Sequence, residues 1–169
     1  MTNLTTQRLT MKRPQEQDRA SYVAYYTSKR RASSGPVQTQ DQAEVGFENL
    51  LSHWDDKGFG RFVVFLEGTA IGLIGPHQPK SYPEPEMAWQ IWQDAHEGKG
   101  YAAEASRAAL DYAFGPLGWK TAVSYIANDN QRSIALATRL GAVVDPNAAI
   151  IPNEVPHQVF RHPKAEVTQ

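Results

Sequence analysis

Two glycines flanking a lysine stand directly before an alanine-rich segment, in the run His96-Glu97-Gly98-Lys99-Gly100-Tyr101-Ala102-Ala103-Glu104-Ala105. Because Gly98 and Gly100 lack a Cβ atom, the backbone there can adopt positive φ and bring successive N–H groups close to an anion. A helix beginning at Tyr101 would add a favourable dipole for the same anion, and Lys99 would add a positive charge. The spacing predicts a phosphate-binding turn; the alternative is an ordinary connection between a strand and a helix.

The segments around this turn predict the elements that position it. Met87 to Trp92 form an apolar strand, and apolar residues recur at helical spacing from Tyr101 to Phe114. Neither G-x-G-x-x-G nor G-x-x-x-x-G-K-S/T fits the glycines, so dinucleotide-binding and P-loop motifs are not favoured. A strand over 119–126 would complete a right-handed strand–helix–strand crossover. This crossover places Asn130 beside the turn, at the carboxyl ends of parallel strands, where α/β folds bind ligands.

Two motifs resemble those of the GNAT acetyltransferase superfamily. Residues 97–102, Glu-Gly-Lys-Gly-Tyr-Ala, are similar to its acyl-CoA-binding motif Q/R-x-x-G-x-G/A, with glutamate at the first position. Residues 128–142 resemble the helix that follows, of the form D-N-x-x-S-I-x-x-x-x-x-L-G-F/A. Within the superfamily, Thr6 to Lys12 resemble the strand T-x-R-L-x-x-R of the RimJ/RimL-like branch, which acetylates the N-termini of ribosomal proteins, with lysine in place of the last arginine.

The resemblance implies that the chain transfers an acetyl group from acetyl-CoA to a primary amine by direct attack in a ternary complex, without a metal. It implies cofactor contacts along the central strand, whose backbone pairs with the pantetheine and polarises the thioester, and at the glycine turn and the two helix starts. The residues at these places are Gln90, Ile91, Trp92, Gly98, Lys99, Gly100, Tyr101, Ala102, Ala103, Asn130 and Ser133.

The second motif contains two candidate polar groups. Asn130 can cap the following helix or hydrogen-bond the pantetheine amide, and Asp129 is an alternative cap. Ser133 lies one turn further on, where the resemblance places a serine near the cofactor sulfur. The tyrosine acid of other family members corresponds to Ala137. We therefore expect Ser133, or water, to protonate the leaving thiolate.

Glu86 is the candidate general base or anchor for the acceptor ammonium. It begins the central strand, and strand alternation places it on the same face as Gln90. The alternative is a solvated strand end, with Glu154 and His157 as rival bases. An α-amine of pKa about 7.8 is already ~14% neutral at pH 7 and needs little help from a base. An N-terminal or low-pKa amine therefore matches this chain better than a lysine side chain.

Two further interpretations concern bulky and basic residues. Alternation places Trp89 and Trp92 on opposite faces of the strand; we expect Trp89 in the core and leave the place of Trp92 open. Lys29-Arg30-Arg31 is the only basic run, and it is expected to be a solvated helix end rather than a phosphate-binding patch.

Composition narrows the class of protein. A chain of 169 residues without internal repeats is expected to form one domain over residues 1–169. A net charge of −1 argues against nucleic acid as a partner. The chain has no cysteine, which excludes disulfides and thiolate chemistry. We see no signal peptide and no apolar run that could span a bilayer, so we expect a cytoplasmic protein that is a monomer or a homodimer.

The remaining segments predict one mixed α/β domain, a central mixed sheet flanked by helices in the GNAT-like order β-α-α-β-β-β-α-β-α-β. Before the central strand we expect a strand over 7–13, then a helix over 14–28 and a second helix from Thr39 to 57–58. A hairpin of strands over 61–66 and 70–75 should follow, and then a proline-rich loop over 76–85. The last strand is expected over 158–161. Two functions remain open, an acetyl-CoA-dependent N-acetyltransferase and a GNAT-fold acyl-CoA-binding module without turnover, the latter favoured by Ala137 and Glu97.

Overall fold

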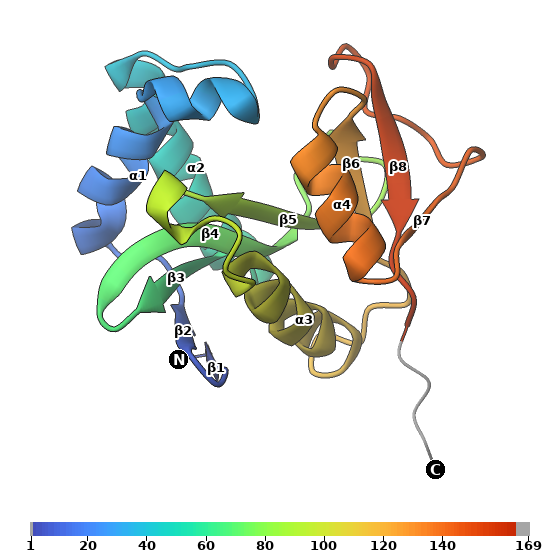
Figure 1. The fold of residues 1–169 in the computed structure, drawn as a ribbon, viewed down its shortest axis with the longest axis horizontal. Helices are drawn as coiled ribbons and strands as arrows, with labels where there is room; N and C mark the ends of the chain where they lie inside the picture. The colour runs from blue at the N-terminus through green and yellow to red at the C-terminus, as the bar shows by residue number, and fades with distance from the viewer. Residues whose placement is uncertain (1, 165–169) are drawn as a thin grey trace.

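A computed structural model describes residues 2–164 as one eight-stranded mixed sheet with helices on both faces (Figure 1). The strand order across the sheet is β1-β2-β3-β4-β5-β6-β8-β7. The strands are β1 (Asn3–Thr5), β2 (Leu9–Lys12), β3 (Phe62–Leu66), β4 (Thr69–His77), β5 (Glu86–Ile91), β6 (Val123–Ala127), β7 (Val143–Val144) and β8 (His157–Arg161). The helices are α1 (Arg19–Tyr26), α2 (Gln40–Lys57), α3 (Tyr101–Phe114) and α4 (Gln131–Arg139), with short 3-10 turns η1 (Glu16–Asp18), η2 (Lys29–Ser33) and η3 (Asp94–His96).

Among residues 2–164, three apolar cores hold the helices against the sheet, and the smallest joins α4 to β6 and β8. The first joins α3 to one face through residues such as Met87 and Ala109, which are fully buried. The second joins α1 and α2 to the opposite face and contains Phe47 and Leu73, also fully buried. The predicted capping box of α2 is present, with reciprocal bonds between Thr39 and Gln42. These local signals agree with the packing and confirm the mixed α/β fold.

The sheet divides between its two parallel strands. β5 and β6 share one register pair, Glu86 with Val123, whereas β6 pairs with β8 at five positions. In Figure 1, β5 passes between α1 and α2 on one side and α4, β6 and β8 on the other. A short parallel ladder leaves the carboxyl ends of both strands free to line a ligand site.

Several predicted boundaries were wrong. The strand expected over 7–13 is shorter and pairs with β1, which the sequence interpretation missed because three residues are too few to show alternation. The helix expected over 14–28 is divided into η1 and α1, because Asp18 accepts a hydrogen bond from the Gln15 N–H and starts a new turn. The strand expected over 119–126 begins only at Val123, and β7 was not predicted. Among the helices described, none combines the length and apolar composition that crossing a membrane requires.

Candidate functional site

Two adjoining cavities lie where β5 and β6 separate. The first, of about 510 Å³, is lined by the end of β5, the glycine turn and the first turns of α3 and α4. The second, of about 1020 Å³, is lined by the start of β5, by β6 and by the loop before β8. Ser33, Ser34 and Asn130 line both cavities. A molecule in the first cavity can therefore meet a molecule in the second at these three residues.

The glycine turn has the predicted conformation. Gly98 has φ +69° and Gly100 has φ +82°, in the left-handed region that other residues rarely adopt. Gly100 caps α3 without any side-chain acceptor for the first helical N–H groups. Tyr101, Ala102 and Ala103 begin the helix and line the first cavity. Uncapped N–H groups at a helix N-terminus in a cavity fit an anionic group such as the diphosphate of acyl-CoA.

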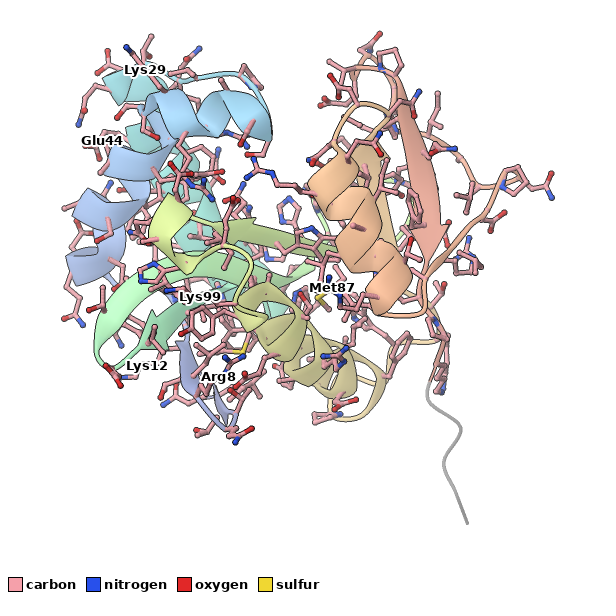
Figure 2. The ribbon with its side chains drawn as sticks, viewed as in Figure 1. Arg8, Lys12, Lys29, Glu44, Met87 and Lys99 are labelled. Carbon is pink, nitrogen blue, oxygen red and sulfur yellow. The ribbon has the colours of Figure 1, made fainter. Side chains whose placement is uncertain are left out.

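The Lys99 side chain lies outside the first cavity, although the sequence predicted it beside the bound anion. This side chain is exposed, and Lys99 is not among the described residues that line the first cavity. Figure 2 labels Lys99 and Arg8 near the start of α3, where Arg8 Nη1 donates to the Lys99 carbonyl over 3.0 Å. Arg8 also pairs with Glu104 on α3. These contacts fix the outside of the turn, and the backbone rather than the lysine faces the cavity.

Trp89 on β5 and Trp92 directly after it lie on opposite faces of the sheet, and the structure shows what each side chain contacts. The Trp92 side chain is buried in the α1–α2 core, where its ring stacks on Tyr25, and the backbone N–H of Trp92 donates to the Ile71 carbonyl. The side chain and the backbone N–H of Trp92 therefore contact the α1–α2 core and Ile71, and contact of the cofactor with the rest of the Trp92 backbone stays a prediction. Trp89, expected in the core, lines the first cavity together with Gln90 and Ile91. The Gln90 side chain accepts a hydrogen bond from the Tyr26 hydroxyl over 2.8 Å.

The start of α4 carries two polar groups into the first cavity. Asn130 Oδ1 accepts from the Ser133 N–H over 3.2 Å, so Asn130, rather than Asp129, caps the helix. Ser133 Oγ accepts from Trp89 Nε1 over 3.2 Å. This bond occupies a lone pair of the hydroxyl and leaves its proton available to a group in the cavity. Ala137 is fully buried against β6, as the core position of this helix requires.

Glu86 is a buried carboxyl group in the wall of the second cavity. It is 8% exposed, pairs across the sheet with His77 and lies on the α1–α2 face of β5. Burial raises the pKa of Glu86 to about 7; the charge of Arg61 and a hydrogen bond from the Tyr125 N–H oppose this rise. The alternative of a solvated strand end is therefore wrong. A carboxyl group with this pKa can accept a proton near neutral pH.

The rival bases differ in their environments. His157 Nε2 accepts from the Ile151 N–H over 3.0 Å, so its other nitrogen, Nδ1, must carry the ring proton that is shared with the Val155 carbonyl over 2.8 Å. Both ring nitrogens are occupied, which leaves His157 a structural residue. Glu154 is exposed in the wall of the same cavity as Glu86. Its charge raises the pKa of Glu86 further, although less than burial does.

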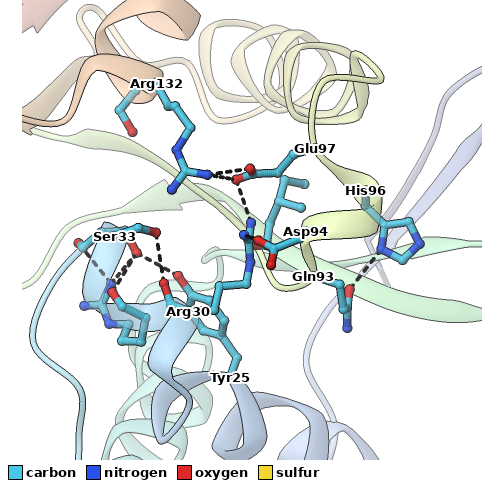
Figure 3. A network of polar contacts seen from close by, with 12 residues as sticks. Tyr25, Arg30, Ser33, Gln93, Asp94, His96, Glu97 and Arg132 are labelled. Carbon is cyan, nitrogen blue, oxygen red and sulfur yellow. Dashed lines mark hydrogen bonds and ion pairs between the residues drawn. The ribbon is translucent and has the colours of Figure 1, made fainter.

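Four arginines line the two cavities among the described residues, and none was predicted as a site residue: Arg30, Arg31, Arg132 and Arg139. Arg30 of η2 donates to the Ile91 carbonyl and to Glu97, and Arg132 of α4 pairs with the same Glu97 (Figure 3). Arg31 stacks on the Tyr26 ring at 4.9 Å and lines the second cavity. The basic run is therefore not a solvated helix end. Its proximity in space to a glutamate 67 positions away could not be seen from local sequence.

Comparisons with known proteins agree with this geometry. Residues 8–143 match the family model of an acetyltransferase (GNAT) domain. The crystal structure of an acetyltransferase from Agrobacterium tumefaciens superposes with a TM-score of 0.90 at 32% identity, covering 97% of this chain and 95% of that one. The uncharacterised protein YkkB of Bacillus subtilis is 26% identical over 152 residues, which are 83% of this chain and 84% of the relative.

A ribosomal-protein acetyltransferase shares the fold at low identity. RimL, a ribosomal L7/L12 α-N-protein acetyltransferase solved in complex with coenzyme A, has a TM-score of 0.75 at 13% identity, with 95% of this chain and 96% of that one covered. The similarity shows a common fold.

Proposed function

Because the chain belongs to the GNAT acetyltransferase family, we propose that it transfers an acetyl group from acetyl-CoA to a primary amine by direct attack within a ternary complex. The observation that supports this most strongly is the meeting of the two cavities at Ser33, Ser34 and Asn130. One cavity carries an anion-binding helix start, and the other carries a buried carboxyl group. A donor and an acceptor can thus approach each other from opposite sides.

The first cavity fits acetyl-CoA. The uncapped N–H groups that follow Gly100 face a diphosphate, and the exposed edge of β5 at Gln90 and Ile91 can hydrogen-bond the pantetheine arm. Asn130 lies where the first cavity joins the second, and Ser133 lines the first cavity three residues further along the chain. Bound in this way, acetyl-CoA supplies an activated acetyl thioester.

The second cavity binds the acceptor amine and contains Glu86, the group that removes its proton. Glu86 takes a proton from the acceptor ammonium, directly or through one water, and the free amine attacks the thioester carbonyl. A C–N bond forms and the C–S bond breaks. The thiolate receives a proton from Ser133 or water, and the second proton, which the nitrogen loses as it becomes an amide, restores that donor. The chain itself needs no covalent intermediate. Orientation of the two reactants supplies much of the rate enhancement.

The acceptor is a protein N-terminus or a small amine. A carboxyl group with a pKa of about 7 is half ionised at neutral pH and deprotonates an α-amine, whose pKa is about 7.8, with little cost. A lysine side chain, with a pKa near 10.4, would need a much stronger base. RimL, which shares the fold, acts on the N-terminus of ribosomal protein L7/L12.

The test is an acetyl-transfer screen in which the release of free CoA thiol is followed with each acceptor in turn. The panel contains amino acids, polyamines, aminoglycosides and peptides with the N-terminal sequences of ribosomal proteins. Saturable CoA release that depends on one amine, with the acetylated product found by mass spectrometry, supports the transferase. Tight binding of acetyl-CoA without transfer to any member would instead favour an acyl-CoA-binding module.

A further inference from the structure

Glu97 lies between two arginines that come from opposite walls of the first cavity. Its Oε1 is 2.6 Å from Arg30 Nη2, and both of its oxygens contact Arg132 Nη1. Figure 3 shows the carboxylate of Glu97 between the two guanidinium groups. Burial raises the pKa of Glu97, and the two arginines outweigh this effect and hold the pKa below its usual range. Glu97 is therefore an anion at neutral pH.

The two arginines differ in how firmly they are held. Arg30 is 14% exposed in its side chain, and it is also anchored to the Ile91 carbonyl over 2.9 and 3.2 Å and to Asp94. Arg132 is 53% exposed in its side chain, and Glu97 is its only polar partner among residues 2–164. Breaking one exposed ion pair would free Arg132, whereas Arg30 would remain in place.

The carboxylate of Glu97 stands at the place where the cavity is suited to bind an anion. Glu97, Arg30 and Arg132 all line the first cavity, and Glu97 directly precedes Gly98 of the anion-binding turn. The same arginines that pair with Glu97 are therefore within reach of a phosphate group bound at that turn. A carboxylate and a phosphate cannot both take the full charge of Arg132, and their mutual repulsion raises the cost of binding.

We propose that Glu97 is an internal competitor for the phosphate groups of the cofactor, which holds Arg132 across the first cavity in the free protein and yields it to bound acetyl-CoA. This inference rests on the proposed function, because it takes acetyl-CoA as the ligand of the first cavity. Glu97 thereby weakens binding of the phosphate part of the cofactor, while it keeps Arg132 pointed at the site. The pantetheine part, which carries no charge, is unaffected.

The experiment measures dissociation constants by calorimetry for acetyl-CoA and for acetylpantetheine, which lacks the phosphates. In Glu97→Gln, the Kd for acetyl-CoA is expected to fall by about threefold to tenfold, the range given by losing one exposed ion pair and one nearby like charge. The Kd for acetylpantetheine should stay unchanged. Asp94→Asn is the matched control, because Asp94 also pairs with Arg30 but is not among the residues lining the cavity. It removes the same charge and should leave both constants unchanged.

A second variant tests the role of Arg132. Arg132→Gln should weaken acetyl-CoA binding, and the loss should be larger in the Glu97→Gln background, where no ion pair has to be broken first. An unchanged or raised Kd for acetyl-CoA in Glu97→Gln, or an equal gain for acetylpantetheine, would overturn the proposal. If the wild-type protein bound neither compound, the proposed function itself would fail.

Discussion

At the scale of single residues, the site depends on two groups whose environments differ from those of surface residues. Glu86 is buried in the wall of the second cavity, and Ser133 accepts a hydrogen bond from Trp89 in the first. Burial makes the Glu86 carboxyl group a base near neutral pH, since it disfavours the charged form. The bond from Trp89 fixes the Ser133 oxygen and directs its proton away from the indole. In the proposed reaction, Glu86 acts on the acceptor amine and Ser133 acts on the leaving thiolate.

Replacing Glu86 tests its role in proton transfer. Glu86→Gln keeps the shape of the side chain and removes its charge, so kcat should fall by about 10²–10⁴. The wild-type rate should decline below pH 7 as Glu86 becomes protonated, and this acidic limb should be absent from the variant. Glu154→Gln is the control, because Glu154 lies exposed in the same cavity and should change mainly the acceptor KM. A Glu86→Gln enzyme with unchanged kcat would assign the proton transfer elsewhere.

The same carboxyl group should affect stability in a pH-dependent way. The folded protein holds the Glu86 proton more tightly than the unfolded chain, in which the pKa of this carboxyl group is near its ordinary value of 4.5. Stability should therefore fall as the pH rises from about 4.5 to about 7, where the folded group ionises. Glu86→Gln should be more stable than the wild type at pH 8, and the difference should vanish below pH 4.5. Urea unfolding at a series of pH values measures this; a variant less stable at pH 8 would contradict it.

Ser133 is expected to act on the leaving thiolate. Ser133→Ala should lower kcat more than it raises the KM for acetyl-CoA, because the interaction strengthens as negative charge develops on sulfur. Trp89→Phe removes the indole donor and keeps the hydroxyl, so it separates positioning of Ser133 from proton donation. A kcat within about twofold of wild type in Ser133→Ala would assign the proton to water.

At the scale of elements, the start of α3 and the end of β5 form the anion site together. The helix begins where Gly100 turns through positive φ, and no side chain occupies the place of a cap. A β-branched residue in this conformation is strained, because the Cβ clashes with its own backbone at positive φ, and the added Cβ would also lie 3.4 Å from Arg8 Nη2 on the outside of the turn. Gly100 is therefore needed for two reasons: the turn requires its positive φ, and that conformation presents the free N–H groups of α3 to the proposed anion.

Gly100→Val should separate these requirements by comparison with Gly118→Val. Both glycines have positive φ, +82° and +66°, but Gly118 lies after the other end of α3, and a Cβ there meets nothing within 4 Å. Both variants should lose stability. Acetyl-CoA at a hundredfold excess over Kd should stabilise the wild type by about 2.7 kcal/mol, and Gly118→Val should keep this gain whereas Gly100→Val loses it. Thermal melting with and without ligand measures both; a normal gain in Gly100→Val would place the cofactor elsewhere.

At the scale of the whole molecule, the two halves of the sheet are joined where β5 and β6 begin to diverge. Ser124 Oγ on β6 donates to the Met87 carbonyl on β5 over 2.6 Å. His162 Nε2 lies 2.8 Å from Ser124 Oγ. Burial lowers the pKa of His162 to about 4, so its ring is neutral at pH 7. This buried link joins β5 to β6 beside their register pair, Glu86 with Val123.

Removing the link should destabilise the entire fold. Ser124→Ala leaves the Met87 carbonyl and His162 without their partner, and the cost should be about 1–3 kcal/mol. The control is Ser106→Ala, because Ser106 on α3 is also buried but its hydroxyl has no hydrogen-bond partner among residues 2–164. Urea unfolding should show a large loss for the first variant and a small change for the second. Equal losses would mean that side-chain volume, rather than the hydrogen bonds, is responsible.

The sequence by itself determined the features that depend on short stretches of chain. The positive φ of Gly98 and Gly100, the cap at Asn130 and the capping box of α2 follow from the stereochemistry of a few neighbouring residues. The placement of Glu86 on the face of Gln90 follows from strand alternation. The crossover from β5 through α3 to β6 contains the glycine turn and ends just before α4, so the proximity of the turn to the start of α4 also followed from element lengths.

Tertiary structure decided which face of each element became the site. Alternation separated Trp89 from Trp92, but the packing of α1 and α2 decided that Trp92 is buried and Trp89 faces the cavity. Arg30 and Glu97 are 67 positions apart, and no local pattern relates them. The pKa of Glu86 likewise depends on residues brought together by folding. Burial and charge pairing are properties of the assembled chain, because they depend on neighbours that are distant in sequence.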